Sequence, residues 1–135
     1  MNAIFADAVY WIALTNPEDQ WHRKATVARK EHPKAELITT EDVLVEVLTY
    51  FGGYGPDVRQ TASRVVRTIL GDPGVEVVPH DSDTFLEGLE LYESRLDKSY
   101  SMVDCMSMQV MWEKDVRDVL THDQHFQQEG FRILL

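Results

Sequence analysis

The sequence contains a single cysteine, Cys105, among 135 residues. One cysteine cannot form a disulfide within the chain, and its apolar neighbours favour a buried structural thiol over a reactive one. No apolar run approaches the roughly 20 residues of a membrane-spanning helix, and the N-terminus lacks the basic start and apolar core of a signal peptide. We therefore expect a cytoplasmic protein that carries out no thiol redox chemistry.

Positive charge is also scarce, because 13 lysines and arginines stand against 23 aspartates and glutamates. The net charge of −10 argues against nucleic-acid binding through overall electrostatic attraction. The basic residues gather in two short regions, which we interpret mainly as solvated helix faces with some capacity to form a rim for a polyanionic substrate. These residues are Arg23, Lys24, Arg29, Lys30 and Lys34 in the first region, and Arg59, Arg64 and Arg67 in the second.

Length and composition fit one domain, residues 1–135, because 44% hydrophobic and 27% charged residues are typical of a soluble globule. Predicted strands alternate with predicted helices along the chain. This alternation predicts an α/β three-layer sandwich with a central, mainly parallel sheet flanked by helices. The expected strands are 2–6, 37–39, 75–78, 116–120 and 131–134. The expected helices are 8–14, 18–31, 41–51, 57–70, 82–96 and 102–112, with a short helical segment within 121–128.

Four acidic residues lie in segments whose apolar neighbours predict burial or contact with a buried element: Asp7, Glu46, Asp104 and Asp123. Asp7 and Asp123 follow predicted strands, so they fall at the carboxyl edge of the sheet, where binding crevices form. Asp104, in the first turn of a strongly apolar helix, is expected to face the same edge. Glu46 lies at the border of an apolar helical arc and can join them. Clustered carboxylates need a cation, and hard oxygen ligands suit Mg²⁺ or Mn²⁺.

Each acid also has a simpler explanation. Asp104 completes a Ser101-x-x-Asp104 capping pattern, whereas Asp7 and Asp123 could cap the helical segments that follow them. Glu46 could be a surface residue whose carboxylate reaches into water. Four such coincidences near one edge of one sheet are harder to accept than one shared site. We therefore expect a metal site and, without metal, at least one carboxyl with a raised pKa.

Other functions fit the residues less well. A phosphatase of the haloacid dehalogenase type would need an aspartate two residues after Asp7, where Val9 stands. A phospho-receiver domain would need a lysine late in the sheet, and Lys114 is poorly placed for that role. The pair His122 and His125 suggests zinc, but no cysteine accompanies it and the pair lies in a predicted loop. A non-catalytic module that binds a metal or a partner protein on the same fold remains an alternative.

The four acids and the segments around them resemble the PIN domain family and, within it, the small VapC-like toxins of prokaryotic toxin–antitoxin pairs. The resemblance covers essentially the whole chain and is carried by residues 4–14, 39–46, 100–105 and 120–131. The spacing Thr121-x-Asp123-x-x-Phe126 makes it specific. The chain departs from the family in one turn, because Ala8 and Val9 follow the first acid where many members carry serine or threonine. Any hydroxyl contribution from this turn is therefore in doubt.

The resemblance implies an endoribonuclease that hydrolyses RNA phosphodiester bonds with the help of Mg²⁺ or Mn²⁺. It assigns catalytic and metal-binding roles to Asp7, Glu46, Asp104 and Asp123, and an auxiliary role to Thr121. It further implies a cognate antitoxin protein, whose arginine-bearing tail would enter the acidic crevice and whose helix would cover an apolar groove. A homodimer is the oligomeric state that the resemblance implies.

Overall fold

The computed structural model of the protein describes residues 2–135. Five strands form one sheet in the order β3-β2-β1-β4-β5, and every pair of neighbours is parallel. The strands are β1 (Ala3–Ala6), β2 (Glu36–Thr40), β3 (Val75–Val78), β4 (Asp118–Leu120) and β5 (Arg132–Ile133). The helices are α1 (Ala8–Thr15), α2 (His22–Glu31), α3 (Glu41–Phe51), α4 (Pro56–Gly71), α5 (Ser82–Ser94), α6 (Met102–Glu113) and α7 (Gln124–Gln128).

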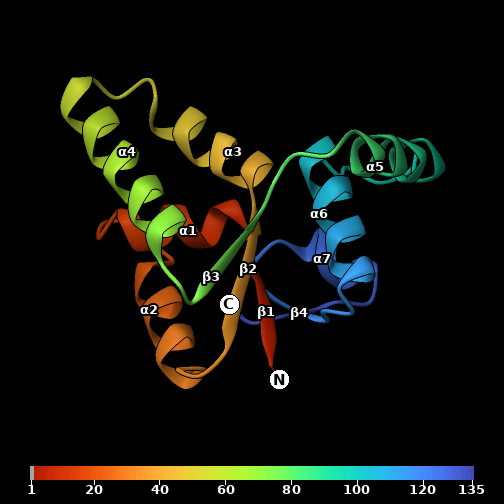
Figure 1. Ribbon diagram of the computed structural model, residues 1–135, viewed down its shortest axis with the longest axis horizontal. Coiled ribbons are helices and arrows are strands. Elements are labelled where there is room, and N and C mark those ends of the chain that lie inside the picture. Colours follow the sequence, from red (N-terminus) through yellow and green to blue (C-terminus); the bar gives the residue numbers. More distant parts are fainter. Residues whose placement is uncertain (1) are drawn as a thin grey trace.

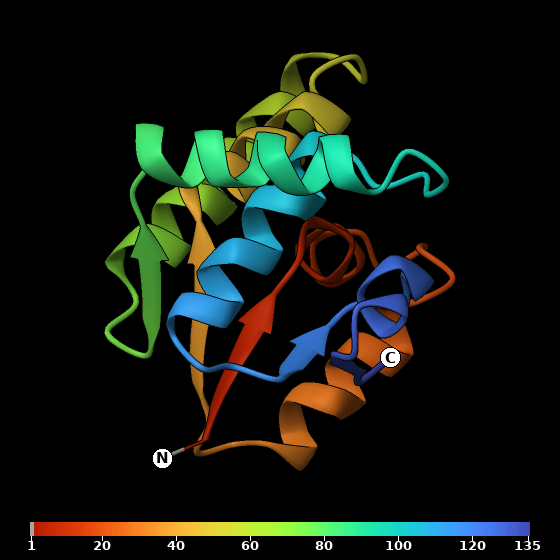
Figure 2. The same cartoon turned by 90° about the vertical axis from the view of Figure 1, so that its right-hand side faces the viewer.

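Helices lie on both sides of the sheet, which confirms the expected three-layer α/β architecture (Figure 1). In Figure 1, α1, α2 and α4 lie on one side of the strands, and α6 and α7 lie on the other. Figure 2 shows α5 crossing α6 close to the end toward which the strands point. Within residues 2–135, no helix combines the length and the apolar character needed to cross a membrane.

The strand order reverses direction at β1. The chain proceeds from β1 to β2 and β3 on one side, and later adds β4 and β5 on the other side. In open parallel sheets this reversal leaves a crevice outside the carboxyl ends of the two central strands. Asp7 directly follows β1 and Thr121 directly follows β4, so both residues lie at this crevice.

Helix α6 occupies the centre of one helical layer. Its sequence is apolar on almost every side, and Cys105, Met108 and Met111 are completely buried. Met108 and Met111 therefore serve packing, and the expectation that Cys105 is a buried thiol is confirmed. Burial raises the pKa of the Cys105 thiol to about 11, which keeps it protonated and unreactive.

Two helices differ from expectation. Helix α2 begins at His22 instead of residue 18, because the side chains of Asn16 and Asp19 accept hydrogen bonds from backbone N–H groups two residues later, at 3.1 and 2.8 Å. Such local turns compete with helix formation. In helix α3, Leu48 and Tyr50 belong to the apolar arc that was expected to be buried, but they are 39% and 45% exposed. The helix therefore buries a narrower face than expected.

Candidate active site

Asp7 is 4% exposed and stands at the start of α1. Its backbone is extended, as at a helix N-cap, but its side chain makes no capping hydrogen bond. Instead, Oδ2 of Asp7 accepts a hydrogen bond from the Thr121 hydroxyl at 3.1 Å. The simpler explanation of Asp7 as a helix cap is therefore wrong, and its carboxylate lies toward the crevice.

Thr121 is completely buried at the end of β4. Its hydroxyl donates to Asp7 and accepts a hydrogen bond from the backbone N–H of Asp123 at 3.1 Å. One hydroxyl thus links the ends of the two central strands and orients the loop that carries Asp123.

Asp104 lies in the first turn of α6 and is 7% exposed. It forms a capping box, in which its Oδ2 accepts from the Ser101 N–H at 3.1 Å and its own N–H donates to the Ser101 hydroxyl at 3.0 Å. The capping role expected as an alternative is therefore real. It uses only Oδ2, because Oδ1 has no hydrogen-bond partner among the described residues.

Asp123 caps α7, since its Oδ1 accepts from the His125 N–H at 2.9 Å. Glu46 is half-buried on α3 and reaches the site from the helix that follows β2. All four predicted acids line one cleft of about 340 Å³, so the structure brings together the residues that the sequence places far apart. The remaining lining residues are Ala8, Val9, Ile12, Tyr50, Ser99, Ser101 and His125.

Burial and mutual repulsion inside this cleft raise the pKa values of two carboxyls. The pKa of Asp7 is raised to about 7, first by burial and then by the negative charges of Asp104 and Glu46. The pKa of Glu46 is also raised to about 7, by burial and then by Asp104 and Asp123. This agrees with the expectation of a raised pKa in the absence of metal.

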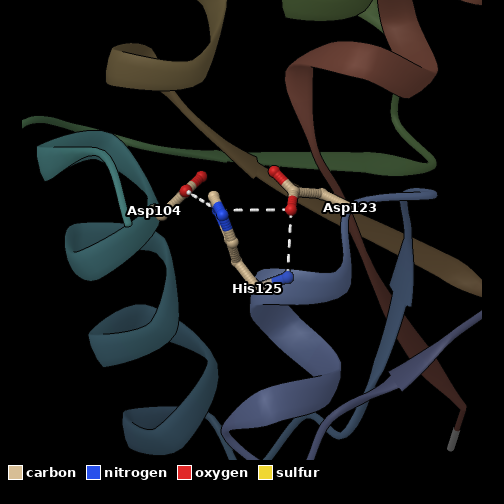
Figure 3. Close-up of side chains that lie close together, drawn as sticks. All are labelled: Asp104, Asp123 and His125. Carbon is tan, nitrogen blue, oxygen red and sulfur yellow. Dashed lines mark hydrogen bonds and ion pairs between the residues drawn. The ribbon is translucent and has the colours of Figure 1, made fainter. Parts of the chain in front are cut away.

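Sequence reasoning overlooked His125 as a companion of the acids. Its Nδ1 lies 3.0 Å from Oδ2 of Asp104 and 3.2 Å from Oδ1 of Asp123 (Figure 3). The other histidine of the pair is directed elsewhere, because the His122 ring stacks on Trp21 with a centroid distance of 4.1 Å and an interplanar angle of 12°. The two histidines therefore do not form the zinc pair considered from the sequence. One feature of the sequence could have indicated this contact: His125 lies two residues after Asp123, which was considered as a possible helix cap.

The donor set suits a hard divalent cation. Asp104, Asp123 and His125 each present one potential ligand atom, and these atoms lie within 4.8 Å of one another. Among the described residues that line the cleft there is no lysine or arginine to balance the carboxylates. Oxygen-rich, negatively charged sites of this kind match the ligand preferences of Mg²⁺ and Mn²⁺, so the residues present fit such an ion.

Comparisons with known proteins agree with this geometry. The family model described as "PIN domain" matches residues 4–131. Among solved structures, the chain is similar to the VapC20 toxin of Mycobacterium tuberculosis, which is described as cleaving the sarcin–ricin loop. The two chains are 26% identical, the similarity covers 95% of each, and the TM-score is 0.86. A comparison with curated proteins gives no significant match. Because the family model spans nearly the whole chain and includes every acid of the cleft, the chain belongs to the PIN domain family.

Proposed function

We propose that this protein is a metal-dependent endoribonuclease that acts as the toxin of a toxin–antitoxin pair. Membership of the PIN domain family and the similarity to VapC20 support a ribonuclease toxin. The observation that carries the proposal is the convergence of four carboxylates in a cleft whose described lining includes no lysine or arginine. Such an arrangement is unfavourable by itself and becomes favourable with a divalent cation.

The proposed roles follow from where each side chain lies. Asp7, Asp104 and Asp123 hold the cation, directly or through water, and Glu46 is a further ligand or orients the attacking water. Thr121 fixes the carboxylate of Asp7 through its 3.1 Å hydrogen bond. When bound, Mg²⁺ or Mn²⁺ lowers the pKa of coordinated water and stabilises negative charge that develops on the phosphate.

The substrate that this chemistry fits is the RNA phosphodiester backbone, whose negative charge the acidic cleft repels unless a cation is present. This makes binding of the RNA and binding of the metal mutually dependent. A cytoplasmic location is part of the same proposal, because the RNA substrate and the antitoxin would be encountered there.

An apolar groove supports the proposal of an antitoxin partner. It has a volume of about 440 Å³ and lies between α1, α4 and the edge of the sheet. An amphipathic helix that buries its apolar face is the ligand that such a groove fits. The apolar side chains that line it are Tyr10, Trp11, Leu14, Leu37, Val65, Ile69 and Val75.

Exposed apolar side chains on α3 and α5 support the proposal of a homodimer. Val45 and Leu86 are 60% and 56% exposed, and further apolar residues of both helices are also accessible. A second copy of the chain would remove these surfaces from water.

The experiment that tests the function is RNA cleavage by the purified protein. End-labelled RNA is incubated with Mg²⁺, with Mn²⁺ or with a chelator, and wild type is compared with Asp104→Asn. Asparagine keeps an oxygen that can cap α6, so the variant is expected to fold while losing activity by about 10²-fold or more. Asp118→Asn is the matched control, because Asp118 pairs with Arg132 at 2.8 Å and does not line the cleft.

Two results would overturn the proposal. Cleavage that continues in chelator would show that no metal is needed, and equal cleavage by Asp104→Asn would show that the cleft is not the site. A protein that binds a partner but never cuts RNA would instead be the non-catalytic adaptor considered from the sequence.

A further inference from the structure

His125 connects two acids that come from different parts of the chain. Asp104 lies on α6, whereas Asp123 lies in the loop between β4 and α7. Nδ1 of His125 contacts one oxygen of each, at 3.0 and 3.2 Å. Because both partners are carboxylate oxygens, which accept hydrogen bonds when ionised, Nδ1 must carry the proton in this arrangement.

Asp104 and Asp123 use their two carboxylate oxygens in the same way. Oδ2 of Asp104 accepts the Ser101 N–H and a hydrogen bond from His125 Nδ1, and Oδ1 of Asp123 accepts the His125 backbone N–H and lies 3.2 Å from Nδ1. The other oxygen of each carboxylate has no hydrogen-bond partner among the described residues. Figure 3 shows these two oxygens turned to the same side, away from the imidazole. One oxygen of each acid is thus used for structure and the other is left for a ligand.

A second network holds the ring of His125 in place. The Tyr100 ring packs against it with a centroid distance of 5.3 Å, and the Tyr100 hydroxyl donates to Glu129 Oε2 at 2.8 Å. Arg95 donates to both oxygens of Glu129, at 2.9 and 3.1 Å. Glu129 ends α7, so this network ties the segment before α6 to the helix that carries His125. The imidazole therefore has a supported orientation and is not a freely rotating surface group.

We propose that His125 is a positioning residue of the metal site, and this inference rests on the function proposed above. Its Nδ1–H donates to one oxygen of Asp104 and lies against one oxygen of Asp123, so that the remaining oxygens point together into the cleft and bind the cation. Residues that orient metal ligands in this way typically contribute a factor of about 10–100 to metal affinity. Although His125 also presents a potential ligand atom, in this proposal Nδ1 does not ligate the metal, because its proton is donated to Asp104.

Direct measurement of metal affinity tests this role. Isothermal titration calorimetry with Mn²⁺ and with Mg²⁺ compares wild type, His125→Asn and His125→Leu. Asparagine places an N–H donor close to the position of Nδ1, whereas leucine keeps a similar bulk without a donor. We expect His125→Leu to raise the Kd by about 10- to 100-fold and His125→Asn to stay close to wild type. His122→Ala is the matched control, since His122 stacks on Trp21 instead of contacting the acids, and its Kd should not change.

Each outcome either supports or overturns the positioning role of His125. Unchanged Kd in His125→Leu would overturn the positioning role, and tighter binding would show that the imidazole competes with the cation. If wild type bound neither metal, the proposed metal-dependent function would fail together with the inference. Thermal melts without metal establish that each variant is folded, and His125→Ala replaces the leucine variant if that one does not fold. A 10-fold or greater loss that asparagine prevents would support the proposal.

Discussion

The hydroxyl of Thr121 donates a hydrogen bond to Oδ2 of Asp7 across a separation of 114 residues. The hydroxyl oxygen of Thr121 also accepts a hydrogen bond from the backbone N–H of Asp123 at 3.1 Å. These two bonds join the ends of β1 and β4 where the acids meet. The bond from the Thr121 hydroxyl stabilises the buried charged form of Asp7, because hydrogen bonding to a carboxylate opposes the effect of burial on its pKa.

Thr121→Val removes both hydrogen bonds while keeping the shape of the side chain. We expect the variant to lose about 1–3 kcal/mol of stability in urea unfolding, because a buried carboxylate oxygen is left without its donor. RNA cleavage should fall as well, since Asp7 and the Asp123 loop lose their common anchor. Thr121→Ser retains the hydroxyl and should preserve most of the activity. Wild-type stability in Thr121→Val would contradict the structural role assigned to this bond.

The raised pKa of Asp7 predicts that the metal-free protein becomes less stable as pH rises. The folded-state pKa is about 7 and the unfolded value is 3.8, so between these values the folded chain binds more protons than the unfolded chain. The free energy of unfolding therefore falls by about 1.4 kcal/mol for each pH unit between about pH 4 and pH 7. Above pH 7 it levels off. Glu46, whose pKa is also raised to about 7, acts in the same direction.

Asp7→Asn isolates this contribution, because it removes the charge and leaves the other titrating groups in place. In chemical denaturation with chelator from pH 5 to pH 8, the free energy of unfolding of the variant should increase relative to that of wild type as pH rises. A constant difference across this range would mean that the carboxyl of Asp7 titrates normally.

Divalent metal should raise the melting temperature of the wild-type protein. A ligand that binds only the folded state stabilises it by about 2.7 kcal/mol at 100 times its Kd. The effect should be larger at pH 8 than at pH 5, where Asp7 and Glu46 are protonated and bind a cation poorly. Differential scanning fluorimetry with Mn²⁺, Mg²⁺ and chelator measures this shift. Equal melting temperatures under all three conditions would indicate that the cleft binds no cation.

Glu46→Gln separates metal binding from the chemical step. Glu46 reaches the cleft from α3, whereas His125 belongs to α7. If it orients the attacking water, glutamine should lower the cleavage rate by about 10²-fold or more while metal affinity changes much less. A parallel loss of affinity and rate would assign Glu46 as a metal ligand. A variant as active as wild type would exclude both roles.

Gly88 permits close packing of α5 on α6. A Cβ atom at this position would lie 2.9 Å from Met106 Cγ and 3.2 Å from the Met106 backbone nitrogen. The clash should cost about 1–3 kcal/mol against a gain of about 1 kcal/mol in helix propensity, so we expect Gly88→Ala to destabilise the protein by up to about 2 kcal/mol. Gly71→Ala is the control, because a Cβ there meets no atom within 4 Å. Thermal melts of the two variants should therefore shift in different directions or by clearly different amounts.

The sequence was sufficient to place Asp7, Asp104 and Asp123 together from the expected topology. Asp7 and Asp123 come after apolar strands, and parallel strands bring their carboxyl ends to one edge. Helical spacing puts Glu46 only at the border of an apolar arc, and its place among the acids was implied chiefly by the resemblance to the PIN domain family. His125 does not follow from any such rule, because its contact with Asp104 spans 21 positions and depends on how α7 packs beside α6. Contacts of this kind exist only in the folded protein.

The boundaries of β4 show the same limit in the fold. Residues 116–120 were expected to form a strand, but β4 begins at Asp118. Val116 is buried like a strand residue, yet its N–H donates to Met111 O at 2.8 Å and closes the turn after α6. Asp115 in that turn has a φ of 54°, which ends the helix. The sequence therefore predicts the burial of Val116 correctly. It does not predict that the backbone N–H of Val116 bonds to Met111 in α6 instead of to a neighbouring strand.

Because every strand of the sheet is parallel to its neighbours, the carboxyl ends of the strands lie on one side of the molecule and the amino ends lie on the other. Every acid of the cleft belongs to the carboxyl ends of the strands or to helices that border them, whereas the turns that enter β2 and β3 lie at the opposite edge. Pro33 and Lys34, before β2, are exposed at that edge. An affinity tag or a fluorophore inserted there should be accepted without contact with the cleft. The protein can thus be immobilised at the amino ends of its strands while the acidic cleft at the carboxyl ends remains accessible for assays of the proposed RNA cleavage.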